Sequence, residues 1–203
     1  VVGENNHYFI RIDREERING RKYFYELRHR LDEIREGISL IVISDYDKET
    51  VSKKLVEYLS SWNVPIFVDT KVRDPYIYDE RTTLLKLNFT EAAELSSCMK
   101  MKHESFFDWT WKVTRIISDK LHCRMVVITL GENGLSFYDS LNESFHYIMP
   151  RNVREIVDLS GAGDTVLSVA AYLTVLGYDL KEIARVSNGA AGLVVSKRGT
   201  SFV

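Results

Sequence analysis

The sequence has little of what marks a secreted, membrane-spanning or nucleic-acid-binding protein. Only two of its 203 residues are cysteines, Cys98 and Cys123, which are too few for a disulfide framework and lack metal-ligand spacing. No apolar run could span a bilayer, and the first residues do not resemble a signal peptide. The 27 basic and 29 acidic residues are interspersed and give a formal net charge of -2, so no basic patch invites nucleic acid or an anionic membrane. These absences predict a cytoplasmic protein that binds neither.

What the sequence does contain is enough apolar material for one substantial core. Hydrophobic residues make up 45% and charged residues 28% of the chain, as in an ordinary globular domain. We find no repeat, low-complexity tract or linker and therefore predict a single domain over residues 1–203. The five histidines have no metal-ligand spacing, so we assign them no role.

Apolar runs alternate with amphipathic segments along most of the chain. The runs predict strands at residues 39–44, 65–69, 83–87 and 125–129, the first two buried on both faces, and a rougher alternation predicts another at 7–13. Helical periodicity predicts helices at residues 20–35, 49–62, 89–97, 103–121, 161–176 and 179–197. A turn-rich stretch at 139–144 between two aromatic segments predicts a hairpin. Together these elements predict a three-layer α/β/α fold with a mostly parallel central sheet and right-handed crossovers.

Ligands of such a sheet gather outside the carboxyl ends of its strands. The polar or small residues at those ends are the first candidates for a site, namely Asp45, Asp69, Lys71, Asn88, Thr129 and Gly131.

The strongest chemical signal is the run from Gly161 to Thr165, which directly precedes an apolar helix. Small residues let the backbone approach a ligand closely, and the amides at a helix start attract phosphate. An aspartate in that first turn, Asp164, could accept a proton from an attacking hydroxyl. The alternative is a glycine-rich turn in which Asp164 only complements the helix dipole.

The context of this run resembles the C-terminal signature of the ribokinase-like (PfkB) sugar kinases. Residues 158–165 read Asp-Leu-Ser-Gly-Ala-Gly-Asp-Thr and precede an alanine-rich helix and the segment Ser187–Gly192. Three further segments agree in order: residues 88–91 with the Asn-x-x-Glu motif, residues 129–134 with the Thr-x-Gly-x-x-Gly nucleotide loop, and residues 199–200 with the closing turn.

Within that family the chain most resembles the kinases of D-glycero-D-manno-heptose 7-phosphate, which serve ADP-heptose and lipopolysaccharide-precursor synthesis. Residues 10–13, 44–49 and 68–74 are similar to segments typical of that group. The chain departs from them at Asp47 and Glu49, where those kinases have glycine, and at Thr70 and Leu87, where they have proline.

The resemblance implies an ATP-dependent phosphotransferase acting on the anomeric hydroxyl of that heptose phosphate or of a related sugar. Asp164 would be the general base, and the amides of Gly161, Ala162 and Gly163 would form the anion hole. Asn88 and Glu91 would organise Mg²⁺ through its waters. The implied nucleotide contacts are Asn88, Thr129, Gly131, Gly134 and Asn188, and Lys71 could meet a phosphate. Taken alone, each of these residues also fits an ordinary turn, cap or solvated charge.

The family's N-terminal portion, with its sugar-binding Gly-Gly-x-x-Asn motif, has no counterpart in residues 1–203. We therefore expect an N-terminally truncated fold that does not phosphorylate sugar alone, and an open sheet edge covered by a homodimer or by the missing portion. The competing hypothesis is a non-catalytic nucleotide-binding or assembly module derived from such a kinase.

Overall fold

The computed structural model describes residues 20–71, 75–78, 80–149 and 161–196, so the strand predicted at 7–13 and the turn at 199–200 lie outside them. Its elements in chain order are α1 (Gly20–Ile34), η2 (Arg35–Gly37), β1 (Ile41–Asp45), α2 (Lys53–Ser60), β2 (Ile66–Thr70), η3 (Pro75–Tyr78), β3 (Leu84–Asn88), α3 (Phe89–Ser96), α4 (Phe106–Leu121), β4 (Met125–Thr129), η4 (Gly131–Asn133), β5 (Leu135–Asp139), β6 (Ser144–Ile148), α5 (Ala162–Val175) and α6 (Leu180–Val195).

The strands form one six-stranded sheet in the order β1-β2-β3-β4-β5-β6. The first four are parallel, whereas β5 and β6 run antiparallel to their neighbours as the predicted hairpin. Because parallel neighbours run in the same direction, the carboxyl ends of β1 to β4 all lie on the same side of the sheet. The mostly parallel sheet is confirmed.

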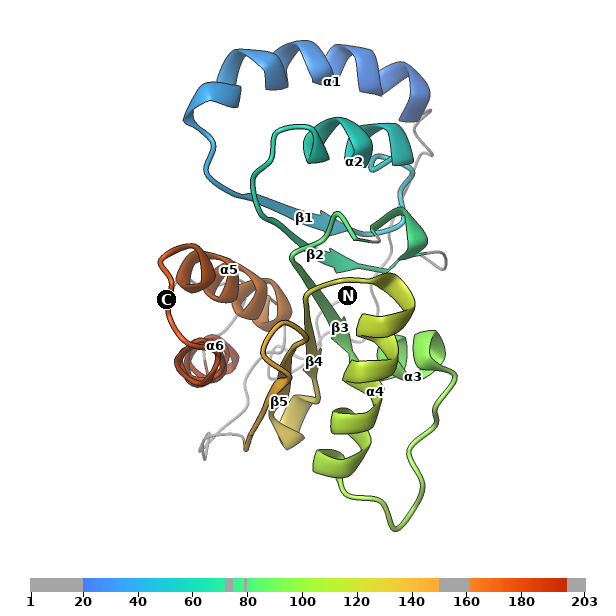
Figure 1. Cartoon of the computed structure of the whole chain (residues 1–203), viewed down its shortest axis with the longest axis vertical. Helices are drawn as coiled ribbons and strands as arrows, with labels where there is room; N and C mark the ends of the chain where they lie inside the picture. Colours follow the sequence, from blue (N-terminus) through green and yellow to red (C-terminus); the bar gives the residue numbers. More distant parts are fainter. Residues whose placement is uncertain (1–19, 72–74, 79, 150–160, 197–203) are drawn as a thin grey trace, which may run out of the picture.

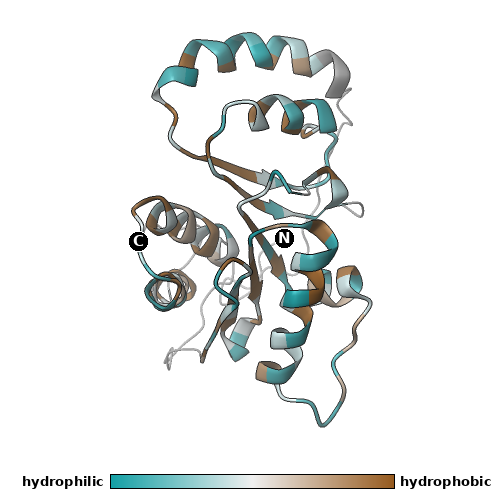
Figure 2. Cartoon of the chain, viewed as in Figure 1, coloured by the Kyte–Doolittle hydropathy of each residue, from teal (hydrophilic) through white to brown (hydrophobic). Residues whose placement is uncertain are grey.

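Helices cover both faces of this sheet, with α5 and α6 on one side and α3 and α4 on the other (Figure 1). Alternate residues along the strands pack into two separate hydrophobic cores, one on each face of the sheet. Val68, Leu85 and Val126 pack towards α2, α3 and α4, whereas Phe67, Leu84 and Met125 pack towards α5 and α6. Apolar residues accordingly concentrate on the strands and on the inner helix faces (Figure 2). The predicted three-layer architecture is confirmed.

Two helices begin later than the periodicity predicted, because side-chain caps fix their starts. The Ser52 side chain accepts a hydrogen bond from the amide of Leu55, so α2 starts at Lys53 and not at residue 49. Ser105 caps α4 in the same way, with the amide of Asp108 as donor. Glu49 has a φ of 60°, a left-handed value that an α-helix cannot contain.

The prediction that the first strand is buried on both faces is wrong for β1. Its pattern alternates, with Ile43 buried, Ser44 exposed and Val42 41% exposed. Within the described residues only β2 pairs with β1, so β1 lies at an edge. The other predicted doubly buried strand, β2, is buried at every position. None of the helices in the described part of the chain has the length and apolarity of a membrane span.

Candidate active site

One cavity of about 740 Å³ lies where the carboxyl ends of β2, β3 and β4 meet the start of α5. It is lined by all the residues to which the family resemblance gave a role, namely Lys71, Asn88, Glu91, Thr129, Gly131, Gly134, Gly161, Ala162, Gly163, Asp164 and Asn188. Of the other strand-end candidates, Asp69 lines the cavity and Asp45 does not. The structure thus brings these residues to one cavity, and their roles stay predictions.

The first turn of α5 forms one wall of the cavity. Gly161 is the N-cap residue with a φ of 79°, a left-handed value that glycine adopts without strain. The amide of Thr165 is the first to donate within the helix, to the Gly161 carbonyl, so the amides before Thr165 have no acceptor inside the helix. Half-buried Asp164 sits in this turn and accepts a hydrogen bond of 3.4 Å from the Ser44 hydroxyl at the end of β1. The turn therefore offers amide donors beside a carboxylate.

Beneath this turn lies a buried ion pair between Asp69, a candidate from the sequence, and Lys86, which was not predicted. Lys86 and Asp69 are register partners on β3 and β2, with exposures of 6% and 7%. The Lys86 Nζ donates to Asp69 Oδ2 at 2.5 Å. A Cβ on Gly163 would lie 2.8 Å from that Nζ, so the glycine leaves room for the ammonium. The available signal was a lysine inside an apolar strand, two residues before Asn88.

Asn88 and Glu91 form a capping box at the junction of β3 and α3. The Asn88 Oδ1 accepts from the Glu91 amide at 2.9 Å, and Glu91 Oε2 accepts from the Asn88 amide at 2.7 Å. Burial raises the pKa of Glu91 above 4.5, although the hydrogen bond from Asn88 and the charge of Lys86 oppose the rise. The Asn-x-x-Glu spacing thus has a structural function, and it holds both side chains at the cavity.

The nucleotide loop of the sequence prediction forms the opposite rim. The amide of Leu130 donates to the Gly134 carbonyl at 2.8 Å and closes the turn around η4. The Tyr147 hydroxyl donates to the Asn133 carbonyl at 2.7 Å. Asn188, on α6, donates to the Met149 carbonyl at 3.0 Å. This bond ties α6 to the hairpin and fixes the Asn188 side chain.

A second buried group supports the end of β1. The Tyr78 hydroxyl donates to Asp45 Oδ2 at 2.6 Å, and the amide of Asp47 donates to Asp45 Oδ1 at 3.0 Å. Next to it, Lys71 Nζ lies 4.2 Å from the centre of the Tyr46 ring. Lys71 is therefore held over an aromatic face at the cavity mouth, a contact that steadies a lysine.

Comparisons with known proteins show the family of the chain. The family model described as pfkB family carbohydrate kinase matches residues 24–203. The bifunctional protein HldE of Nitratiruptor sp. is 30% identical over 199 residues, which cover 97% of this chain and 41% of HldE. HldE of Escherichia fergusonii is 31% identical over 204 residues, 100% of this chain and 41% of the relative. The chain thus spans less than half the length of these curated relatives.

Solved structures share the fold at lower identity. Phosphofructokinase-2 from Escherichia coli in complex with substrates and products has a TM-score of 0.71 at 21% identity, covering 87% of this chain and 59% of that one. Ribokinase from Arabidopsis thaliana, complexed with ribose and ATP, has a TM-score of 0.67 at 23% identity, covering 83% and 53%. The predicted ribokinase-like fold is confirmed.

Proposed function

The chain belongs to the pfkB family of carbohydrate kinases, and from this premise we propose that it transfers the terminal phosphoryl group of ATP to a sugar hydroxyl. The observation that carries the proposal is Asp164 beside the amides of the α5 turn, in one cavity with Lys86 and the capping box. Phosphoryl transfer needs little beyond positioning and charge stabilisation, which these groups can supply.

In this mechanism Asp164 takes the proton of the sugar hydroxyl while that oxygen attacks the terminal phosphorus of ATP. The bond from phosphorus to the ADP oxygen breaks, so the products are a sugar phosphate and ADP. The amides of Gly161, Ala162 and Gly163 stabilise the charge on the transferring group. The Ser44 hydroxyl, as donor to Asp164 Oδ1, orients the base.

Mg²⁺ fits the donors that face the cavity. This ion usually binds proteins through one or two carboxylates, retained waters and substrate phosphates, and not through a complete protein cage. The described residues hold no group of three acidic, His or Cys side chains that could cage a metal. Asn88 and Glu91 would hold the ion through water, and it would neutralise the phosphate charge of the nucleotide.

The remaining cavity residues would bind the rest of the nucleotide. We assign Thr129, Gly131 and Gly134 to the ribose and phosphates, and Asn188 to the neighbourhood of the adenine. Lys71 would contact a phosphate, and its position over Tyr46 supports this. Residues 1–203 would act as the nucleotide-binding and catalytic part of a single cytoplasmic kinase domain.

For the acceptor we propose D-glycero-D-manno-heptose 7-phosphate or a related phosphorylated sugar. The proposal is supported by the likeness of residues 44–49 and 68–74 to segments of the heptose kinases. Lys71 and Lys86, which line the cavity, also suit a phosphorylated sugar. Among the residues that the structure describes, β1 has β2 as its one strand neighbour, and such an edge supports a homodimer or a complementing N-terminal portion. The same edge favours the competing hypothesis, a nucleotide-binding module without sugar turnover.

The test separates nucleotide binding from phosphoryl transfer. Calorimetry would measure ATP and ADP affinity with Mg²⁺, and a coupled assay would measure ADP release with and without heptose 7-phosphate. Asp164→Asn should keep nucleotide affinity within about twofold. In a longer protein with a complete sugar site it should lower ADP release by about 100-fold or more, the usual contribution of a general base.

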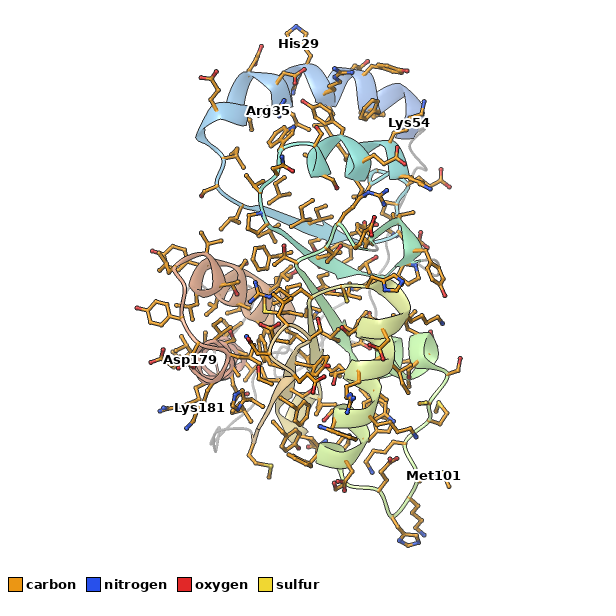
Figure 3. All side chains as sticks on the ribbon, viewed as in Figure 1. His29, Arg35, Lys54, Met101, Asp179 and Lys181 are labelled. Carbon is orange, nitrogen blue, oxygen red and sulfur yellow. The ribbon has the colours of Figure 1, made fainter. Side chains whose placement is uncertain are left out.

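Asp179→Asn is the matched control, because Asp179 caps α6 and its side chain points outward (Figure 3). Asparagine caps a helix as well as aspartate does, so this variant should behave like the parent. Unchanged ADP release in Asp164→Asn of the longer protein would refute the base assignment. Nucleotide binding without any sugar-dependent release in the longer protein would select the module hypothesis, and no binding at millimolar ATP would refute both.

A further inference from the structure

The buried ion pair under the α5 turn is placed unusually for a purely structural contact. Lys86 and Asp69 lie in the row of residues that faces α5, and Ser44 continues this row onto β1. A buried lysine and a buried aspartate each carry a large desolvation cost, which a single hydrogen bond offsets poorly. A pair of apolar residues would have served the packing here at least as well.

The pair also keeps unused hydrogen-bonding capacity. Asp69 Oδ1 is buried and has no donor among the residues that the structure describes. Within the same residues Lys86 has Asp69 as its acceptor, so further N–H donors of its ammonium remain available. Buried polar groups are normally paired, so the spare N–H groups of Lys86 point to an anionic ligand, while Asp69 Oδ1 can accept from a donor such as water.

Gly163 shows where that ligand would lie. Its missing side chain brings the α5 turn so close that an added Cβ would be 2.8 Å from Lys86 Nζ and 3.4 Å from Cε. The ammonium therefore sits directly under the amides that would receive a phosphoryl group. One anion would be contacted by the helix amides from above and by the lysine from below.

Resting on the proposed kinase function, we infer that Asp69 is a positioning residue that holds Lys86 against Gly163 to recognise the terminal phosphoryl group of the nucleotide. Asp69 restricts a side chain that would otherwise occupy several rotamers. Gly163 forms a three-residue unit with Asp69 and Lys86, because a Cβ at position 163 would displace the Lys86 ammonium. The unit should therefore distinguish a triphosphate from a diphosphate.

The experiment measures the affinity of the chain for ADP and for the imido analogue of ATP by calorimetry with Mg²⁺. Lys86→Met should weaken analogue binding about 10- to 100-fold, the range for one charge-assisted hydrogen bond, and ADP binding by less than about threefold. Asp69→Asn should weaken analogue binding by about 3- to 10-fold, because the lysine stays but loses its anchor. Lys181→Met, an outward-pointing lysine on α6 (Figure 3), is the matched control and should change neither affinity.

Double variants test whether the three residues act as one unit. Once Lys86 is Met, adding Asp69→Asn should cost nothing more in analogue affinity. Gly163→Ala should weaken analogue binding in the parent chain, yet have less than about a twofold effect once Lys86 is Ala, because the displaced group is gone. Thermal unfolding of each variant identifies any loss of fold.

The inference is overturned if folded Asp69→Asn leaves analogue affinity unchanged or raises it, if it weakens ADP and analogue equally, or if its effect adds fully to that of Lys86→Met. In each of these cases Asp69 would have only a general structural role. A parent chain that binds neither nucleotide would instead refute the kinase proposal itself.

Discussion

The loop after β1 contains a strained residue, Glu49, at which glycine should give a more stable protein than alanine. Glu49 has a φ of 60°, at a position where the heptose kinases resembled by this sequence have glycine. A left-handed conformation costs a residue with a Cβ about 1 to 2 kcal/mol. Glycine avoids that cost but loses about 0.4 to 1 kcal/mol of unfolding free energy through the greater freedom of its unfolded chain. The midpoints of these two ranges give a net expected gain of about 0.8 kcal/mol for Glu49→Gly over Glu49→Ala.

The comparison with alanine is essential, because the Glu49 side chain makes an interaction of its own. Both variants remove that interaction, and only glycine relieves the backbone. Glu57, exposed within α2, supplies the matched control. There the order should reverse, with Glu57→Ala about 1 kcal/mol more stable than Glu57→Gly.

Chemical denaturation of all four variants gives the difference in unfolding free energy between glycine and alanine at position 49 and at position 57. If alanine equalled or exceeded glycine at position 49, the backbone strain assigned to this loop would be refuted, whatever the result at position 57.

Three further predictions concern buried titratable groups. Tyr78→Phe should lower the free energy of unfolding by about 1 to 3 kcal/mol, since Asp45 loses a buried donor; denaturant titration measures the change. Burial raises the pKa of Cys123 to about 12, so thiol reagents at neutral pH should label half-buried Cys98 first and Cys123 only on unfolding, as peptide mass spectrometry can follow. Burial raises the pKa of Glu91 above 4.5, so the folded chain binds more protons there than the unfolded chain. Stability should fall as pH rises from 4.5 through the raised pKa, and denaturation at several pH values should show a smaller fall in Glu91→Gln.

Much of the fold could be predicted because its strands are apolar runs of ordinary length bounded by turns. The carboxyl-end rule then brought residues distant in sequence to one edge of the sheet. This is why Asn88, Gly131 and Asp164 could be assigned to one site before their contacts were known. The family resemblance supplied their proposed roles, which spacing alone could not.

What could not be predicted depends on contacts between elements. Lys86 looks like a surface residue on a strand until β2 supplies Asp69 beside it and α5 covers both. The exposure of β1 follows from strand order, which no local pattern encodes. The starts of α2 and α4 are a different case, since Ser52 and Ser105 are ordinary capping residues that the sequence itself contains as signals.

Strand β3 passes into helix α3 with no connecting residue, because Asn88 ends the one and caps the other. This junction should tolerate no change of length during evolution or engineering. One inserted residue would rotate α3 by about 100° about its axis and carry Glu91 away from the cavity. The segment from Ser97 to Ser105, between α3 and α4, carries no regular element and should absorb insertions freely. Length variation among related chains should therefore concentrate there, and the spacing from Lys86 to Glu91 should stay constant.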